Sequence, residues 1–201
     1  MLFPFKTPKI LKGSFPSMEW EKKDEKLHLT FDDGPHPTIT PWVVELLDKH
    51  EIKATFFCVG ENALLYPEVI ELIKSKGHQI ANHSHNHLNG WKTNNKKYFE
   101  NIELANHTLQ SNLFRPPYGK IKSSQRKVIE KEYRIIQWSL LSGDFNPSLN
   151  KQKAFKALCS GTNPGDIIVF HDSVKAEENL KFLLPKYLEY CIENNFEFGL
   201  L

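Results

Sequence analysis

The chain has 201 residues, of which 40% are hydrophobic and 25% are charged, which suits one soluble domain with a buried core. Its 26 lysines and arginines against 24 acidic residues leave a formal charge of +2, so composition gives no electrostatic case for nucleic-acid binding. No run of about 18 apolar residues occurs, and the sequence therefore predicts no transmembrane segment.

The first 26 residues mix lysine and proline into an apolar background and contain no continuous apolar run. We expect residues 1–26 to form an N-terminal extension that packs on the domain, without a secretory signal, and on that ground we expect a cytoplasmic location. The three cysteines, Cys58, Cys159 and Cys191, are odd in number and scattered, which indicates thiols rather than a disulfide framework.

Apolar runs rich in β-branched and aromatic residues alternate with segments of helical periodicity along the rest of the chain. The runs predict seven strands, at 26–31, 53–60, 78–84, 113–117, 133–141, 165–172 and 196–201. The periodic segments predict helices at 41–50, 66–77, 96–112, 123–132, 151–161 and 179–195. No repeat or low-complexity linker interrupts them, so residues 27–201 are expected to form a single domain.

Strands that alternate with helices are typical of parallel α/β folds. Right-handed crossovers place all the helices on one side if the sheet closes, which gives a barrel of the (β/α) kind. The alternative is an open doubly wound sheet, although no Gly-x-Gly-x-x-Gly segment follows the first strand. In either architecture, ligands bind at the carboxyl ends of the strands.

Titratable residues collect at those carboxyl ends. The predicted strands end at or near Asp32, Asp33, His83, Arg115, Asp144 and His171. Each residue alone has an ordinary structural explanation, since an aspartate beside a glycine often forms a turn or a cap. Titratable residues at the ends of five strands are better explained by one functional site, formed along the edge where the carboxyl ends of the strands meet. We call this edge the rim.

The segment 82–87, Asn-His-Ser-His-Asn-His, contains a candidate metal-binding pair. His83 and His87 are four residues apart, so one helical turn from His83 would place both imidazoles on one face. A carboxylate from Asp32 or Asp33 would complete a site with two histidines, one carboxylate and open positions, as in catalytic metal centres. The alternative is a solvated loop that happens to be rich in histidine, but the paired acids on the same rim favour the metal site.

Five short segments, in order, resemble the five motifs of the polysaccharide deacetylases, also called the NodB-homology or carbohydrate esterase family 4 domain. They are TFDDGP (30–35), HSHNH (83–87), RPPYG (115–119), WSLLSGDF (138–145) and IVFH (168–171). The match runs from about Leu27 to near the end of the chain; the fourth motif is partial. The resemblance implies an α/β fold, a distorted, incomplete (β/α) barrel with about seven parallel strands.

The resemblance implies that Asp33, His83 and His87 are ligands of one divalent metal ion. This ion is usually Zn²⁺ in the family, and Co²⁺, Ni²⁺ or Mn²⁺ are alternatives that such a site accepts. His85 matches no ligand position of the family, so we expect it to be a loop residue or to support the ligands.

The resemblance also implies catalytic roles. Asp32 corresponds to the general base, and Arg115 to the residue that orients it. His171 corresponds to the general acid, and Asp144 to the residue that keeps this histidine protonated. The backbone N–H of Tyr118 is expected to stabilise the oxyanion.

The residues expected to line the substrate pocket are Pro116, Pro117, Tyr118, Phe145 and Ile168. Two of these depart from the family pattern, since Phe145 replaces a tryptophan and Ile168 stands where leucine is usual. Leu141 also replaces an acid of the fourth motif, which removes one support expected for Arg115. The replacements in the pocket remain apolar, and every catalytic and metal-binding role is still filled, so we expect an active enzyme.

The expected function is removal of N-acetyl groups from glycans that contain N-acetylglucosamine, of the chitooligosaccharide or peptidoglycan type. One alternative is a hydrolase of the same mechanism that cleaves O-acetyl esters of xylan-type glycans or a non-sugar amide. A second alternative, of another class, is a silent carbohydrate-binding domain. The expected partner is an acetylated carbohydrate, and neither a nucleic acid nor a membrane span is expected.

Overall fold

A sheet of seven parallel strands forms the centre of the computed structural model, which describes residues 5–201. The strands lie in the order β5-β4-β3-β2-β1-β7-β6, and every neighbouring pair is parallel. They are β1 (His28–Asp32), β2 (Thr55–Cys58), β3 (Gln79–Asn82), β4 (Leu113–Phe114), β5 (Arg134–Ile135), β6 (Leu140–Leu141) and β7 (Ile167–His171).

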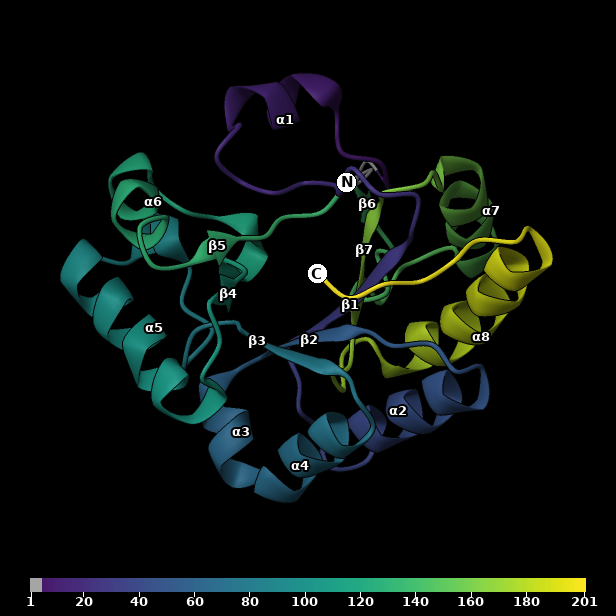
Figure 1. The fold of residues 1–201 in the computed structure, drawn as a ribbon, viewed down its shortest axis with the longest axis horizontal. Coiled ribbons are helices and arrows are strands. Elements are labelled where there is room, and N and C mark those ends of the chain that lie inside the picture. The colour runs from purple at the N-terminus through teal and green to yellow at the C-terminus, as the bar shows by residue number, and fades with distance from the viewer. Residues whose placement is uncertain (1–4) are drawn as a thin grey trace.

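The helices surround the sheet on its outer side, apart from the first, which lies at the open side of the barrel (Figure 1). They are α1 (Lys9–Ser14), α2 (Ile39–Lys49), α3 (Gly60–Leu65), α4 (Pro67–Ser75), α5 (Asn95–Leu109), α6 (Ser123–Ile129), α7 (Lys151–Gly161) and α8 (Glu177–Glu193), with 3-10 turns η1 (Gly90–Lys92) and η2 (Pro117–Gly119). The six predicted helices are confirmed as α2, α4, α5, α6, α7 and α8. The short helices α1 and α3 were not predicted. None of the helices in residues 5–201 is long and apolar enough to cross a membrane.

The prediction of one strand over residues 133–141 is wrong. The two ends of this run form β5 and β6, which lie at opposite edges of the sheet. A flat sheet of seven strands would separate its edges by about 29 Å, whereas the four residues between β5 and β6 span about 17 Å at most. The sheet must therefore curl into the incomplete barrel, and residues 136–139 cross the remaining gap.

The predicted final strand at 196–201 is also wrong, because only one bridge, between Leu27 and Phe198, joins this segment to the sheet. The segment turns across the amino-terminal mouth of the barrel, with two carbonyl oxygens, of Gly199 and Leu200, each 3.1 Å from Nδ1 of the buried His28. Leu201 packs against side chains inside the barrel. The number of strands is thus as predicted, but a split run supplies the seventh.

Both faces of the central strands are buried, as expected for a parallel sheet covered by helices. On β7, Ile168 and Phe170 face the larger core between sheet and helices, whereas Ile167 faces the cluster inside the barrel. This alternation directs every second side chain of a strand toward the barrel axis. Cys58 and Cys191 are buried, Cys159 is half-buried, and all three thiols are free.

Residues 5–26 of the predicted extension run along the open side of the barrel (Figure 1). Single bridges join Lys6 to Leu140, Glu19 to Ile136 and Glu21 to Asp166. The extension therefore contacts both β6 and the crossing segment 136–139, where the sheet has no strand of its own. Residues 1–4 lie outside the described part of the chain.

Candidate metal and catalytic site

The predicted rim is formed by the carboxyl ends of the strands. Asp32 is the last residue of β1 and lies opposite His171, the last residue of β7, in the strand register. His83 directly follows β3, and Arg115 directly follows β4. The parallel sheet thus brings together side chains that are up to 139 residues apart, at the edge where the sequence placed them.

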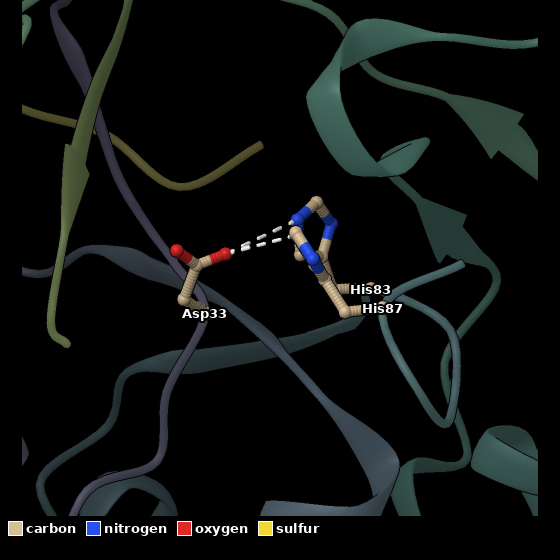
Figure 2. Close-up of side chains that lie close together, drawn as sticks. All are labelled: Asp33, His83 and His87. Carbon is tan, nitrogen blue, oxygen red and sulfur yellow. Dashed lines mark ion pairs between the residues drawn. The ribbon is translucent and has the colours of Figure 1, made fainter. Parts of the chain in front are cut away.

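Asp33, His83 and His87 form one group whose potential ligand atoms all lie within 4.8 Å of one another. Figure 2 shows the carboxylate of Asp33 pointing toward the two imidazoles, with Oδ1 at 3.1 Å from Nε2 of His87 and 3.7 Å from Nε2 of His83. His85 does not belong to this group.

The expectation of a helical turn from His83 to His87 is wrong, because this segment is a loop with left-handed backbone at Ser84 (φ 62°) and His87 (φ 52°). Two buried asparagines hold the loop. The Asn82 side chain accepts a hydrogen bond from the backbone N–H of Ser84, and the Asn101 side chain accepts one from the N–H of His85. The loop reaches the same result as a helical turn, since both imidazoles face Asp33.

The donor set of this group fits a divalent metal ion. Nδ1 of His83 lies 2.8 Å from the carbonyl oxygen of Arg115, so donation from Nδ1 leaves the lone pair on Nε2 facing the site. Burial lowers the pKa of His83 to about 4, which keeps this imidazole neutral. Burial alone would raise the pKa of Asp33, but the hydrogen bond from His87 and the charge of His171 hold it well below its usual range. Two imidazole nitrogens and a carboxylate suit Zn²⁺ and similar ions.

Asp32 is paired with a fully buried arginine. Its Oδ1 accepts a 2.6 Å hydrogen bond from Arg115, whose guanidinium also donates to the Thr30 hydroxyl and to the carbonyl oxygen of Gln137. The guanidinium lies 3.9 Å from the ring centroid of Phe57, inside the barrel. The other oxygen of Asp32, Oδ2, is 3.9 Å from Nε2 of His83. Asp32 therefore has one oxygen fixed by the arginine and one facing the metal-ligand group.

His171 is coupled to a buried carboxylate on its far side. Nδ1 lies 2.7 Å from Oδ1 of Asp144, and the backbone N–H of His171 donates to Oδ2 at 2.8 Å. Burial would lower the pKa of His171, but the charge and hydrogen bond of Asp144 raise it to about 9. This imidazole is therefore protonated at neutral pH, and its Nε2 is left to face the rim.

Most predicted pocket residues surround this group. The Tyr118 ring lies edge-on to His87 with centroids 4.6 Å apart, and the Phe145 ring is 5.1 Å from His171. Tyr118 has a left-handed backbone (φ 61°) in η2, which begins at the buried Pro117 directly after the buried Pro116.

The prediction that Ile168 lines the pocket is wrong, because Ile168 packs in the core between sheet and helices. Val169, two residues before His171, shares the inward face of β7 with it. The period-two alternation of a strand could have identified Val169 from the sequence.

Comparison with known proteins indicates the same family as the sequence motifs do. Residues 20–133 match the family model for polysaccharide deacetylase. A peptidoglycan-N-acetylglucosamine deacetylase of Bacillus cereus is 31% identical over 179 residues, which cover 81% of this chain and 65% of that protein. A chitooligosaccharide deacetylase of Azorhizobium caulinodans is 31% identical over 166 residues, which cover 78% of each chain.

The chain thus spans less than two thirds of the Bacillus relative, and 34% of the peptidoglycan-N-acetylglucosamine deacetylase PgdA of Listeria monocytogenes. Among solved structures, the Bc1960 peptidoglycan N-acetylglucosamine deacetylase superposes with a TM-score of 0.82 at 27% identity. The match covers 97% of this chain and 95% of that one, and that protein was crystallised with 4-naphthalen-1-yl-N-oxidanyl-benzamide.

Proposed function

The chain belongs to the polysaccharide deacetylase family, and we therefore propose that it is a metal-dependent hydrolase that removes N-acetyl groups from N-acetylglucosamine-containing glycans. The names of its relatives support this substrate class. The observation that carries the proposal is the pairing of a carboxylate, Asp32, and a protonated imidazole, His171, at the ends of adjacent strands beside the ligands Asp33, His83 and His87. A binding module has no need of an acid and a base in this arrangement.

Asp33, His83 and His87 would hold the metal ion. When bound, a divalent cation of this kind acts as a Lewis acid that polarises the acyl oxygen and makes water easier to deprotonate near neutral pH. Neutral His83 and ionised Asp33 are the protonation states that ligation requires.

Asp32 acts as the general base that takes a proton from the attacking water. The hydrogen bond from Arg115 fixes one carboxylate oxygen, and the oxygen on the side of His83 is left to accept the proton. The ion pair also places the positive guanidinium directly against this carboxylate. Arg115 is thus a positioning residue in this proposal.

His171 acts as the general acid that protonates the leaving amine. An amine leaves poorly unless it is protonated, so a donor that is still charged at neutral pH is required. Asp144 supplies this condition, because it accepts from Nδ1 and leaves Nε2–H as the donor. The backbone N–H of Tyr118 is proposed to stabilise the oxyanion, which the left-handed turn at Pro117–Gly119 supports by exposing this residue.

The test is acetate release from N-acetylglucosamine oligomers beside acetylated xylan, with chelator and then with added Zn²⁺, Co²⁺, Ni²⁺ or Mn²⁺. We expect release from the amino-sugar oligomers that is lost with chelator and restored by metal. The variant Asp32→Asn, which keeps the size of the side chain but removes the base, should bind metal and release no acetate. Release from xylan alone would overturn the substrate class. If the purified protein binds no metal and releases no acetate, the proposal that it is an enzyme would be refuted.

A further inference from the structure

The backbone of the metal-ligand residue Asp33 is held in an unfavourable conformation. Its φ of 77° lies in the left-handed region, which residues other than glycine adopt uncommonly, and contacts from the surrounding structure help to hold it. Two contacts come from the neighbouring strand and helix, because the Asn62 side chain donates to the carbonyl oxygen of Asp33 and Val59 N–H donates to that of Gly34. Both contacts hold carbonyl oxygens, and neither holds an N–H of this loop.

The N–H side of the loop is held by Asp172, a residue that the proposed chemistry does not use. Asp172 follows β7 and is 1% exposed. Its Oδ1 accepts a 3.2 Å hydrogen bond from Gly34 N–H, and its Oδ2 accepts one from the Thr40 hydroxyl. The Thr40 hydroxyl in turn accepts a 2.8 Å hydrogen bond from His36 N–H. One carboxylate thus fastens both ends of the loop 33–40.

Gly34 allows this close contact. A Cβ atom at this position would overlap the carboxyl group of Asp172, so the carboxylate lies directly against the backbone next to Asp33. The backbone N–H of Asp172 also donates to the carbonyl oxygen of Asp32 at 3.2 Å. A buried carboxylate with no cation in contact is costly, and burial together with the charge of Asp33 raises the pKa of Asp172 to about 7. Such a cost is commonly retained where a functional site needs the group.

We propose that Asp172 is a positioning residue for the metal site, which holds the loop 33–40 so that the Asp33 carboxylate stays aimed at His83 and His87. This inference rests on the metal site of the proposed function. It predicts that loss of the carboxylate weakens metal binding even though Asp172 contacts neither the metal ligands' side chains nor the substrate. Removal of a partner that orients a metal ligand typically weakens affinity by about 10- to 100-fold.

The decisive measurement is the Kd for Zn²⁺, obtained with the metal-free full chain by competition against a chromophoric chelator at one fixed pH. Asp172→Ala should raise this Kd by about 10- to 100-fold. Asp172→Asn should stay within about threefold of wild type, because its amide can accept from Gly34 N–H and donate to the Thr40 hydroxyl. This rescue by the conservative variant would not follow from a generally weakened fold.

Asp166→Ala is the matched control. Asp166 is also buried and lies at the opposite end of the same strand, where it pairs with Lys6 and accepts from Ser139. This variant should lower the melting temperature but leave the Kd within about twofold. Thr40→Val removes both hydrogen bonds of the Thr40 hydroxyl but keeps Asp172 and its bond to Gly34 N–H. It should raise the Kd by a smaller factor than Asp172→Ala, and it replaces the alanine variant as the test if that variant does not fold.

The outcomes separate this inference from the proposed function. If wild type binds no Zn²⁺, the metal site itself fails. If wild type binds Zn²⁺ and folded Asp172→Ala binds it equally well, only the role of Asp172 is overturned. Equal weakening by Asp166→Ala would also overturn it, because the effect would then be one of stability.

Discussion

Replacement of Asp144 by asparagine tests the assignment of His171 as the general acid. The pKa of His171 is raised from 6.5 to about 9, which corresponds to about 3 kcal/mol in favour of the imidazolium at about 1.4 kcal/mol per pH unit. In Asp144→Asn, burial still opposes the charge but the main favourable interaction is gone, so the pKa of His171 should fall to 6.5 or below. At pH 8 the protonated fraction then falls from about 90% to about 3%.

The assay is the pH profile of kcat/KM for acetate release from an N-acetylglucosamine oligomer, with saturating metal. We expect the alkaline limb of the profile to move down by about two pH units, so that activity falls about 30-fold at pH 8 and less than about threefold at pH 6. An NMR titration of the His171 ring in metal-free protein should report the same shift without turnover. An alkaline limb that stays in place, or an equal loss at every pH, would refute the role assigned to the pair.

The same pair predicts how stability depends on pH in metal-free protein. Between pH 6.5 and about 9 the folded protein keeps a proton on His171 that the unfolded chain has released, so the free energy of unfolding falls as pH rises through this window. Between these pH values the free energy of unfolding of the wild type, measured in urea, should fall by up to about 3 kcal/mol more than that of Asp144→Asn. A parallel pH dependence in the two proteins would contradict the cause assigned to the raised pKa.

Four substitutions test the rest of the site. Arg115→Met leaves the buried carboxylate of Asp32 without its cation and should lower the free energy of unfolding by about 3–5 kcal/mol, measured in urea. His87→Ala should raise the Kd for Zn²⁺ by more than about 100-fold, whereas Asp32→Asn should keep it within about tenfold while acetate release is lost. Gly34→Ala should lower the melting temperature and weaken metal binding, because the added methyl group overlaps the carboxylate behind it.

Each of these changes has a control in the chain. Arg134→Met removes a half-exposed pair with Glu19 and should cost less than about 1 kcal/mol, so a loss equal to that of Arg115→Met would contradict the argument from burial. Gly13→Ala, in α1, adds a methyl group that meets no atom within 4 Å beyond its own helix and chain neighbours, so it should not lower stability and should leave metal affinity unchanged. If Asp32→Asn lost Zn²⁺ binding, the division of roles between Asp33 as metal ligand and Asp32 as general base would be contradicted.

Local sequence patterns were sufficient to place the main site residues at one rim. Asp32, His83, Arg115 and His171 each follow a short apolar run, and parallel strands bring their carboxyl ends to one edge whatever the order of the strands. The spacing of His83 and His87 predicted that the two imidazoles lie together beside a carboxylate, although a loop rather than a helical turn joins them. These predictions succeeded because they depend on the hydrophobic period of each segment and on the direction of each strand, and both are properties of a single element.

Strand membership at the edges was decided by the tertiary structure. The run 133–141 is mostly apolar and contains no glycine or proline, so nothing local distinguishes one long strand from two short ones on either side of a gap. The run splits because its two partner strands, β4 and β7, each lie next to the edge position on opposite sides of a curled sheet. The same limit applies to residues 196–201, where Phe196 and Phe198 pack against the core between sheet and helices and Leu201 packs inside the barrel, although the segment is not a strand.

The sequence by itself therefore determined the parallel α/β class, the rim and the residue types that meet there, since these follow from local periodicity and from the direction of parallel strands. Only the tertiary structure decided which face Ile168 and Val169 occupy, and that Asp172 reaches Gly34 and Thr40 across more than 130 residues of chain. Contacts of this kind depend on how the sheet curls and which strands become neighbours, and no single segment of the sequence carries that information.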